Sequence, residues 1–159
     1  MKKIKCKLAL LLAIVILVGN SNIAIVGATQ ESENQKKVDQ YVKLVEKELQ
    51  RLYDYGQIVY LAKTTNKVDQ EIPKTIYKYI EEVDKLSGEL SEFINTLRYQ
   101  SIERLDASGL FIDVEYIRLA YEALLTYYYA ADTKEAYDAL AVYYYYLSNA
   151  GTSSNLIAQ

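Results

Sequence analysis

The sequence contains no histidine and no tryptophan, and its 159 residues include one cysteine and one proline. Without histidine, the chain cannot carry out Ser/His/Asp or Cys/His catalysis, and it cannot supply imidazole to a Cys/His zinc site. Di-iron four-helix bundles need a Glu-x-x-His motif on each of two helices, so that class is excluded too. Cys6 has no second cysteine to pair with in the chain. We therefore expect no metal, no cofactor and no disulfide.

Basic residues are scarce outside the segment 1–28. That segment holds four lysines and no acid, so residues 29–159 carry 14 basic and 21 acidic side chains, a net charge of −7. Nucleic acids and anionic membrane surfaces are both bound through clustered Lys and Arg. The acidic balance argues against either one as a partner.

The N-terminal segment has the parts of an export signal. A basic region with four lysines precedes an unbroken apolar run over 8–18, and small residues follow up to Ala28. We expect cleavage after Ala28, with a cut after Ser21 as the alternative. The apolar run is about half of the roughly 20 residues that span a bilayer, which disfavours a retained anchor. The sequence thus predicts a signal peptide over 1–28 and a secreted or envelope-located bacterial protein with no stable membrane anchor.

Apolar residues at helical spacing predict an all-α fold. A heptad seam runs along the first segment, with Gly56 at a position where another apolar residue would fall: Val38, Val42, Val45, Leu49, Leu52 and Val59. A second set follows Pro73, a residue suited to the first turn of a helix: Ile76, Ile80, Val83, Leu86, Leu90, Ile94 and Leu97. We expect helices over about 35–63 and 73–105, each roughly 45 Å long. Two helices of this length most simply form an antiparallel hairpin.

Turn and capping signals divide the remainder into a shorter hairpin. Residues 106–112 are expected to form a turn, because they include Ser108 and Gly109, and Asp113 is expected to be the N-cap of a third helix over 113–131. Asp132, followed by Glu135 at the third position, predicts the start of a fourth helix that ends near 148. The expected domain is a helical bundle over 35–148, between a disordered N-terminus at 29–34 and a flexible tail at 149–159.

Tyrosine is the residue in excess, with 17 in the chain, and it forms an internal repeat. The segments 120–129 and 136–145 are identical at seven of ten positions. On one continuous helix the offset between them would turn the copies roughly 160° apart. A fold-back at Asp132 lets both copies contribute to one interface, so the repeat favours two short antiparallel helices.

The tyrosine runs cannot lie entirely on one helix face. Positions spaced i, i+3 and i+7 are expected to face the core in each copy: Tyr121, Leu124 and Tyr128, and then Tyr137, Leu140 and Tyr144. The other tyrosines turn away from that face and are the candidate interaction patch: Tyr127, Tyr129, Tyr143, Tyr145 and Tyr146. The alternative is that these rings pack across the first hairpin as a tyrosine-heavy core.

The composition favours a binding protein over an enzyme. The first hypothesis is a non-enzymatic exported protein that binds another envelope or extracellular protein through the Tyr-rich hairpin. The alternatives are a self-associating coiled-coil structural protein of the cell surface, pairing through the first heptad seam, and, least favoured, a carboxylate-dependent hydrolase acting on envelope polysaccharide. The hydrolase would need two acids in one cleft, with these candidates: Glu89, Glu92, Glu115 and Glu122.

Overall fold

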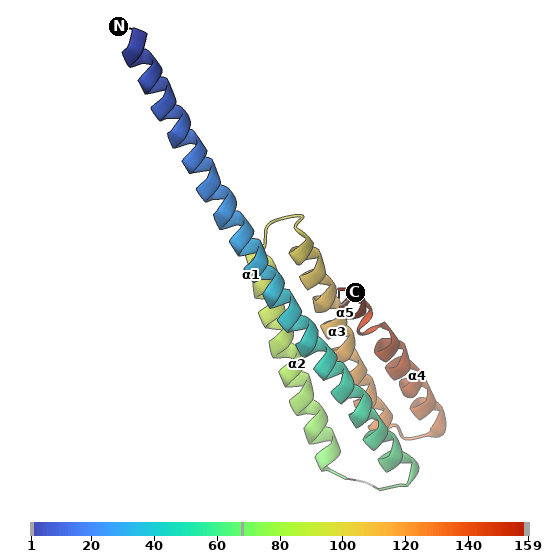
Figure 1. Cartoon of the computed structure of the whole chain (residues 1–159). Coiled ribbons are helices and arrows are strands. Elements are labelled where there is room, and N and C mark those ends of the chain that lie inside the picture. Colours follow the sequence, from blue (N-terminus) through green and yellow to red (C-terminus); the bar gives the residue numbers. More distant parts are fainter. Residues whose placement is uncertain (1, 68, 158–159) are drawn as a thin grey trace. The chain divides into compact units, whose positions relative to one another are not determined.

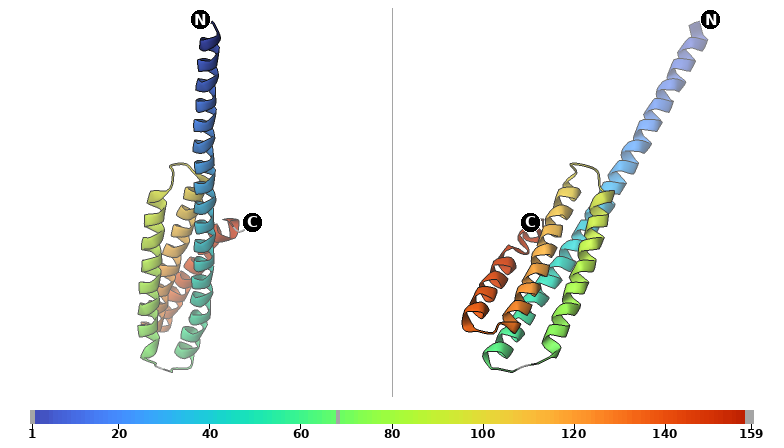
Figure 2. Two further views of the ribbon diagram at one scale, coloured as in Figure 1. Left: turned by 60° about the vertical axis from the view of Figure 1, so that its left-hand side comes forward. Right: turned by 180° about the vertical axis from the view of Figure 1, so that it is seen from behind.

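The computed structural model describes the backbone of residues 2–67 and 69–157 and the side chains of residues 33–67 and 69–157. The helices are α1 (Lys2–Thr64), α2 (Glu71–Thr96), α3 (Ile102–Tyr129), α4 (Thr133–Asn149) and α5 (Thr152–Ile157), shown in Figure 1. No strand occurs in these described ranges, so the prediction of an all-α helical bundle is confirmed. The chain divides after Lys37 into two compact units. In the second unit the rest of α1 packs with α2, α3 and α4, as the two views of Figure 2 show.

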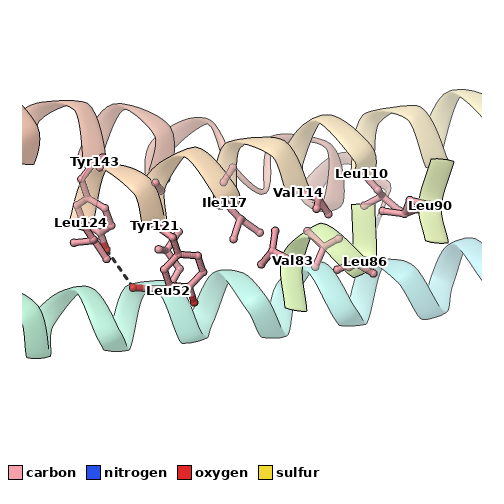
Figure 3. Packing of buried hydrophobic residues seen from close by; sticks show 14 of the residues in the cluster. Leu52, Val83, Leu86, Leu90, Leu110, Val114, Ile117, Tyr121, Leu124 and Tyr143 are labelled. Carbon is pink, nitrogen blue, oxygen red and sulfur yellow. Dashed lines mark hydrogen bonds between the residues drawn. The ribbon is translucent and has the colours of Figure 1, made fainter. Parts of the chain in front are cut away.

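The predicted heptad seam forms the core face of α1. Val38, Val45, Leu52 and Val59 are fully buried, and Gly56 is buried between the last two. They meet apolar residues of α2 and α3, among them Val83, Leu90, Leu110, Val114, Ile117 and Leu124 (Figure 3). The chain's own helices therefore cover the seam that the self-association hypothesis needs at the surface.

The predicted boundary between the second and third helices is wrong. α2 ends at Thr96, Leu97 is extended, and Gln100 has a positive φ of 62°. The side chain of Ser101 then accepts a hydrogen bond of 3.2 Å from the backbone N–H of Arg104, which caps α3. Residues 106–112, expected to be a turn, lie inside α3 because the apolar periodicity continues without a break through them.

Asp113 does not cap α3 but lies in the middle of it and is 1% exposed. Its carboxylate accepts hydrogen bonds from the backbone N–H groups of Ser153 at 3.1 Å and Ser154 at 3.0 Å. These residues open α5, so the acid caps a different helix, far along the chain. Part of the tail expected to be flexible over 149–159 is accordingly a helix packed against α3.

The start of α4 is confirmed as predicted. Asp132 accepts a hydrogen bond from the N–H of Glu135 at 2.9 Å, and the Glu135 carboxylate accepts one from the N–H of Ala131 at 2.7 Å. This reciprocal capping satisfies the first turn of α4. The repeat therefore folds back on itself between α3 and α4, as its offset predicts.

The N-terminal part of α1 includes residues 2–28 of the expected signal peptide. α1 begins at Lys2 and continues through 29–34, the stretch expected to be disordered. Cleavage after Ala28 stays a prediction. Within the described part of the chain, no helix has a stretch both long and apolar enough to cross a membrane.

Candidate binding site: a tyrosine pocket between α1 and α4

The five tyrosines of the predicted patch do not share one exposed surface. Tyr127 and Tyr143 are buried, at 4% and 3% exposure, whereas Tyr129 and Tyr145 are more than half exposed. Tyr146 is half-buried and packs against the ring of Tyr116 at 6.1 Å. The structure therefore distributes the patch between the core and the surface.

The expected core face is partly right for α3, where Tyr128 is only half-buried, and wrong for α4. In α3, Tyr121 and Leu124 are fully buried. In α4 the buried residues are Ala139 and Tyr143, while Tyr137 and Tyr144 point out to solvent. α4 is thus turned by about one residue, roughly 100°, from the face that the repeat suggests. The reason lies in α1, where a glycine receives Tyr143.

Gly56 provides the space that the Tyr143 side chain occupies. A Cβ atom at Gly56 would overlap the Tyr143 hydroxyl and lie 2.8 Å from its Cζ. The hydroxyl donates a hydrogen bond of 3.3 Å to the backbone oxygen of Leu52 (Figure 3). The gap that Gly56 makes in the heptad seam is therefore the contact point between α1 and α4.

A pocket of about 230 Å³ lies beside this contact. α1 and α4 line it with four tyrosines, two leucines, a glycine and a glutamine: Tyr53, Gly56, Gln57, Tyr60, Leu61, Leu140, Tyr143 and Tyr144. Exposed fractions of 48%, 44% and 54% place Tyr53, Tyr60 and Tyr144 at its rim, while Gly56 and Tyr143 are buried. We call this set of eight residues the tyrosine pocket.

Buried rings support two of the rim tyrosines. The ring of Tyr60 is stacked on Tyr127 with centroids 6.3 Å apart and planes 9° apart. The ring of Tyr144 meets Tyr143 edge-on, with centroids 5.1 Å apart. Burial, and then the neighbouring tyrosines, raise the pKa of both Tyr127 and Tyr143, so the supporting phenols stay neutral at physiological pH. The pocket thus has an uncharged and laterally supported aromatic wall.

Charged residues are missing from the pocket and from the helix segments that form it. None of its eight residues is ionic, and neither 55–62 of α1 nor 139–149 of α4 contains Asp, Glu, Lys or Arg. Lys63, next along α1, donates hydrogen bonds to the backbone oxygens of Tyr128 and Ala130 at 3.0 and 2.6 Å, where α3 ends. A neutral aromatic surface therefore lies on a chain that is otherwise rich in acids.

The α1 half of this pocket was not found from the sequence. Tyr53, Gln57 and Tyr60 lie beside the heptad seam and give no signal of their own until the packing partner of α1 is known. The available sign was the run without charge from Tyr55 to Ala62, on a helix that is heavily charged before it. A solvated helix face normally carries charges, so their loss marks a covered or binding face.

A second, more open pocket of about 430 Å³ lies between α3 and α4. It contains the capping residues Asp132 and Glu135, and its Asp138 pairs with Lys134 at 2.8 Å. Because these acids already have partners in capping or ion pairing, the tyrosine pocket is the better candidate for a ligand.

The four acids considered for hydrolysis are not brought together in a cleft. Glu89, Glu92 and Glu122 are exposed, and none of the four lines either pocket. Glu115 accepts a hydrogen bond from Ser87 at 2.8 Å and pairs with Arg118 at 3.3 Å. Among the residues that the structure describes, no group of three or more Asp, Glu, His or Cys side chains could hold a metal ion.

A half-buried carboxylate, Glu48, lies between α1, α2 and α3. Glu48 pairs with Arg51 at 3.0 Å, and Arg51 also pairs with Glu82 and lies 4.8 Å from the Tyr79 ring centre. Burial raises the pKa of Glu48, the nearby Arg51 opposes this, and Glu82 adds to the rise. Glu48 in turn contributes, after burial, to the raised pKa of Tyr121, whose hydroxyl has no hydrogen-bond partner in the described part of the chain. The folded protein therefore holds the Glu48 proton more tightly than the unfolded chain does.

Acidification is expected to stabilise the wild type relative to a Glu48→Gln variant. The folded protein holds the Glu48 proton above the ordinary pKa of 4.5, so the stabilisation is complete below that value and is lost as the pH rises through the folded pKa. Glutamine cannot titrate. Urea unfolding measured from neutral pH down to pH 4 should show the free energy of unfolding of the wild type rising relative to that of E48Q. If the difference in stability between the two proteins does not change with pH, the pKa of Glu48 is not raised in the fold. Glu81→Gln, at an exposed position on α2, is the control.

Comparisons with protein-family models, curated proteins and solved structures found no match.

Proposed function

We propose that the chain is a non-enzymatic exported bacterial protein that binds another envelope or extracellular protein. The binding surface is the tyrosine pocket and its rim, formed by α4 of the Tyr-rich hairpin together with the adjoining face of α1. One observation carries the proposal: Tyr53, Tyr60, Tyr144 and Leu61 are exposed around an uncharged pocket.

The composition of this surface is that of an interface core. Protein interfaces are depleted of charged residues at their centre and enriched in tyrosine, whose ring is apolar and whose hydroxyl tolerates water. Energetically dominant contacts are typically buried aromatic residues in well-packed pockets near the centre. Leu61, which lines the pocket and is 59% exposed, adds aliphatic surface. An acidic export product with one neutral aromatic face fits a protein partner better than a nucleic acid.

A paired substitution at the rim tests this proposal. The Tyr53→Ser/Tyr144→Ser variant removes two exposed rings from the pocket but no buried side chain, so the fold should be kept. Each hot-spot residue contributes about 2 kcal/mol or more, which corresponds to roughly 30-fold in Kd per residue. The protein, secreted from a bacterial host and then immobilised, would capture partners from envelope extracts. The captured partner would be identified and purified, and its Kd measured.

Tyr137→Ser is the matched control for this experiment. Tyr137 is 73% exposed on the same helix and does not line the pocket. Capture should be lost with the paired variant and kept with Tyr137→Ser. If the correctly folded paired variant captures the same partner with unchanged Kd, the proposed surface is wrong.

A further inference from the structure

The volume of the tyrosine pocket matches one ring. Small-molecule sites usually measure about 300–1,000 Å³, and an apolar cavity of about 150 Å³ accepts benzene. The 230 Å³ between α1 and α4 lies between these values. It has room for a single six-membered ring with its linking carbon, but not for a cofactor or a helix.

The buried residues of the pocket offer no free side-chain hydrogen-bond donor. Gly56 and Tyr143 are its buried residues, and the Tyr143 hydroxyl already donates to the backbone oxygen of Leu52. The amide of Gln57 and the rim hydroxyls are the polar groups that remain. A sugar would have only these few groups to pair with its several hydroxyls, and a charged head group would lack a counter-ion, so both are disfavoured.

The supported rings suit an aromatic guest. Aromatic pairs prefer offset-stacked or edge-to-face arrangements with centroids about 4.5–7 Å apart. Tyr60 is backed by Tyr127, and Tyr144 is backed by Tyr143, in a stacked and an edge-on arrangement respectively. A ring inserted beside Tyr60 and Tyr144 would extend both arrangements.

The net charge of the chain favours one kind of partner segment around the ring. Residues 29–159 carry 14 basic and 21 acidic side chains, a net charge of −7. A segment with Lys or Arg on either side of its ring is attracted by this charge, while the pocket itself accepts no charge.

We infer that the tyrosine pocket receives one aromatic side chain from a basic polypeptide segment of the partner. This inference rests on the proposed function and specifies what the partner must present. Tyr53, Tyr60 and Tyr144 enclose the ring, Gly56 and Tyr143 form the inner wall, and Gln57 is the polar group at the mouth. The aromatic residue is the anchor, and the basic flanks increase the association rate.

Selection of displayed random peptides on the immobilised full chain tests the inference. We expect the selected peptides to share one aromatic residue flanked by Lys or Arg. Replacing that residue by Ala should raise Kd by roughly 30-fold, and Tyr144→Ser in the protein should have a similar effect. Tyr137→Ser should leave Kd unchanged, and added salt should weaken binding through the flanks.

Four results would overturn the inference. These are the absence of any binder, selected peptides without a required aromatic residue, binding that is unchanged by Tyr53→Ser and Tyr144→Ser, and competition by methyl glucoside or tetramethylammonium. The last would assign the pocket to a sugar or a cation instead.

If capture of the envelope partner still needs Tyr53 and Tyr144, the proposed function stands without the aromatic anchor. If aromatic peptides bind but capture is unaffected, the proposed function is wrong and the pocket chemistry is right.

Discussion

Gly56→Ala is expected to destabilise the protein by about 2 kcal/mol, although alanine is the better helix former. The added Cβ would overlap the Tyr143 hydroxyl and lie 2.8 Å from its Cζ, so the ring must leave its position. Overpacking costs about 1–3 kcal/mol, and loss of the hydrogen bond to Leu52 adds about 1 kcal/mol. The gain in helix propensity is about 1 kcal/mol and does not offset the sum. Urea unfolding monitored by circular dichroism would measure the difference.

Gly88→Ala is the matched control, because it makes the same change in α2. Apart from the adjacent residues and the local helix backbone, no atom lies within 4 Å of a Cβ built at Gly88, and the position is exposed. This variant should be more stable than the wild type by about 0.5–1 kcal/mol. The two glycine-to-alanine substitutions should therefore have opposite effects on stability. In a Tyr143→Leu background, which removes the hydroxyl and Cζ, Gly56→Ala should cost much less. Equal stability of G56A and wild type would show that Tyr143 does not depend on Gly56.

Local patterns in the sequence were sufficient for the bundle and for one of its helix starts. The seam from Val38 to Val59 and the Asp132–Glu135 capping pair depend on residues within one or two turns of each other. Such patterns predict structure reliably because the interacting residues are close in sequence and helix geometry fixes their relative positions. They predicted the all-α class and the fold-back of the tyrosine repeat.

The errors concern residues whose partners are distant in sequence. Gly109 and Asp113 resemble a turn and an N-cap, but both serve the contact with α5, which no local pattern indicates. Tyr143, in place of Tyr144, faces inward because Gly56 of α1 accepts it. The pocket was missed for the same reason, since half of its wall comes from α1. Helix periodicity predicts that a face is buried, but not which helix will cover it.

Asp113→Ala is expected to release α5 and to reduce stability by about 2–3 kcal/mol. The carboxylate accepts backbone N–H bonds from Ser153 and Ser154, and hydrogen bonds to charged groups contribute about 1.5–3 kcal/mol each. Relief of the buried charge offsets part of this, since burial raises the pKa of Asp113 despite the opposing hydrogen bonds. Amide hydrogen exchange should show protection lost over residues 152–157, ahead of any change in α2.

Two further substitutions separate capping from simple loss of an acid. Asp113→Asn keeps an oxygen acceptor for the α5 amides and should preserve most of the protection, while removing the titration of this site. Asp106→Ala removes a half-buried acid from the same helix, whose pKa burial also raises, and should change stability by about 0.5 kcal/mol or less. Protection of α5 that survives Asp113→Ala would mean that the packing of Ser153 against Gly109 holds the helix without its cap. Asp113 would then be a tolerated buried acid, and its pKa, raised in the fold, would make stability fall as the pH rises through that pKa.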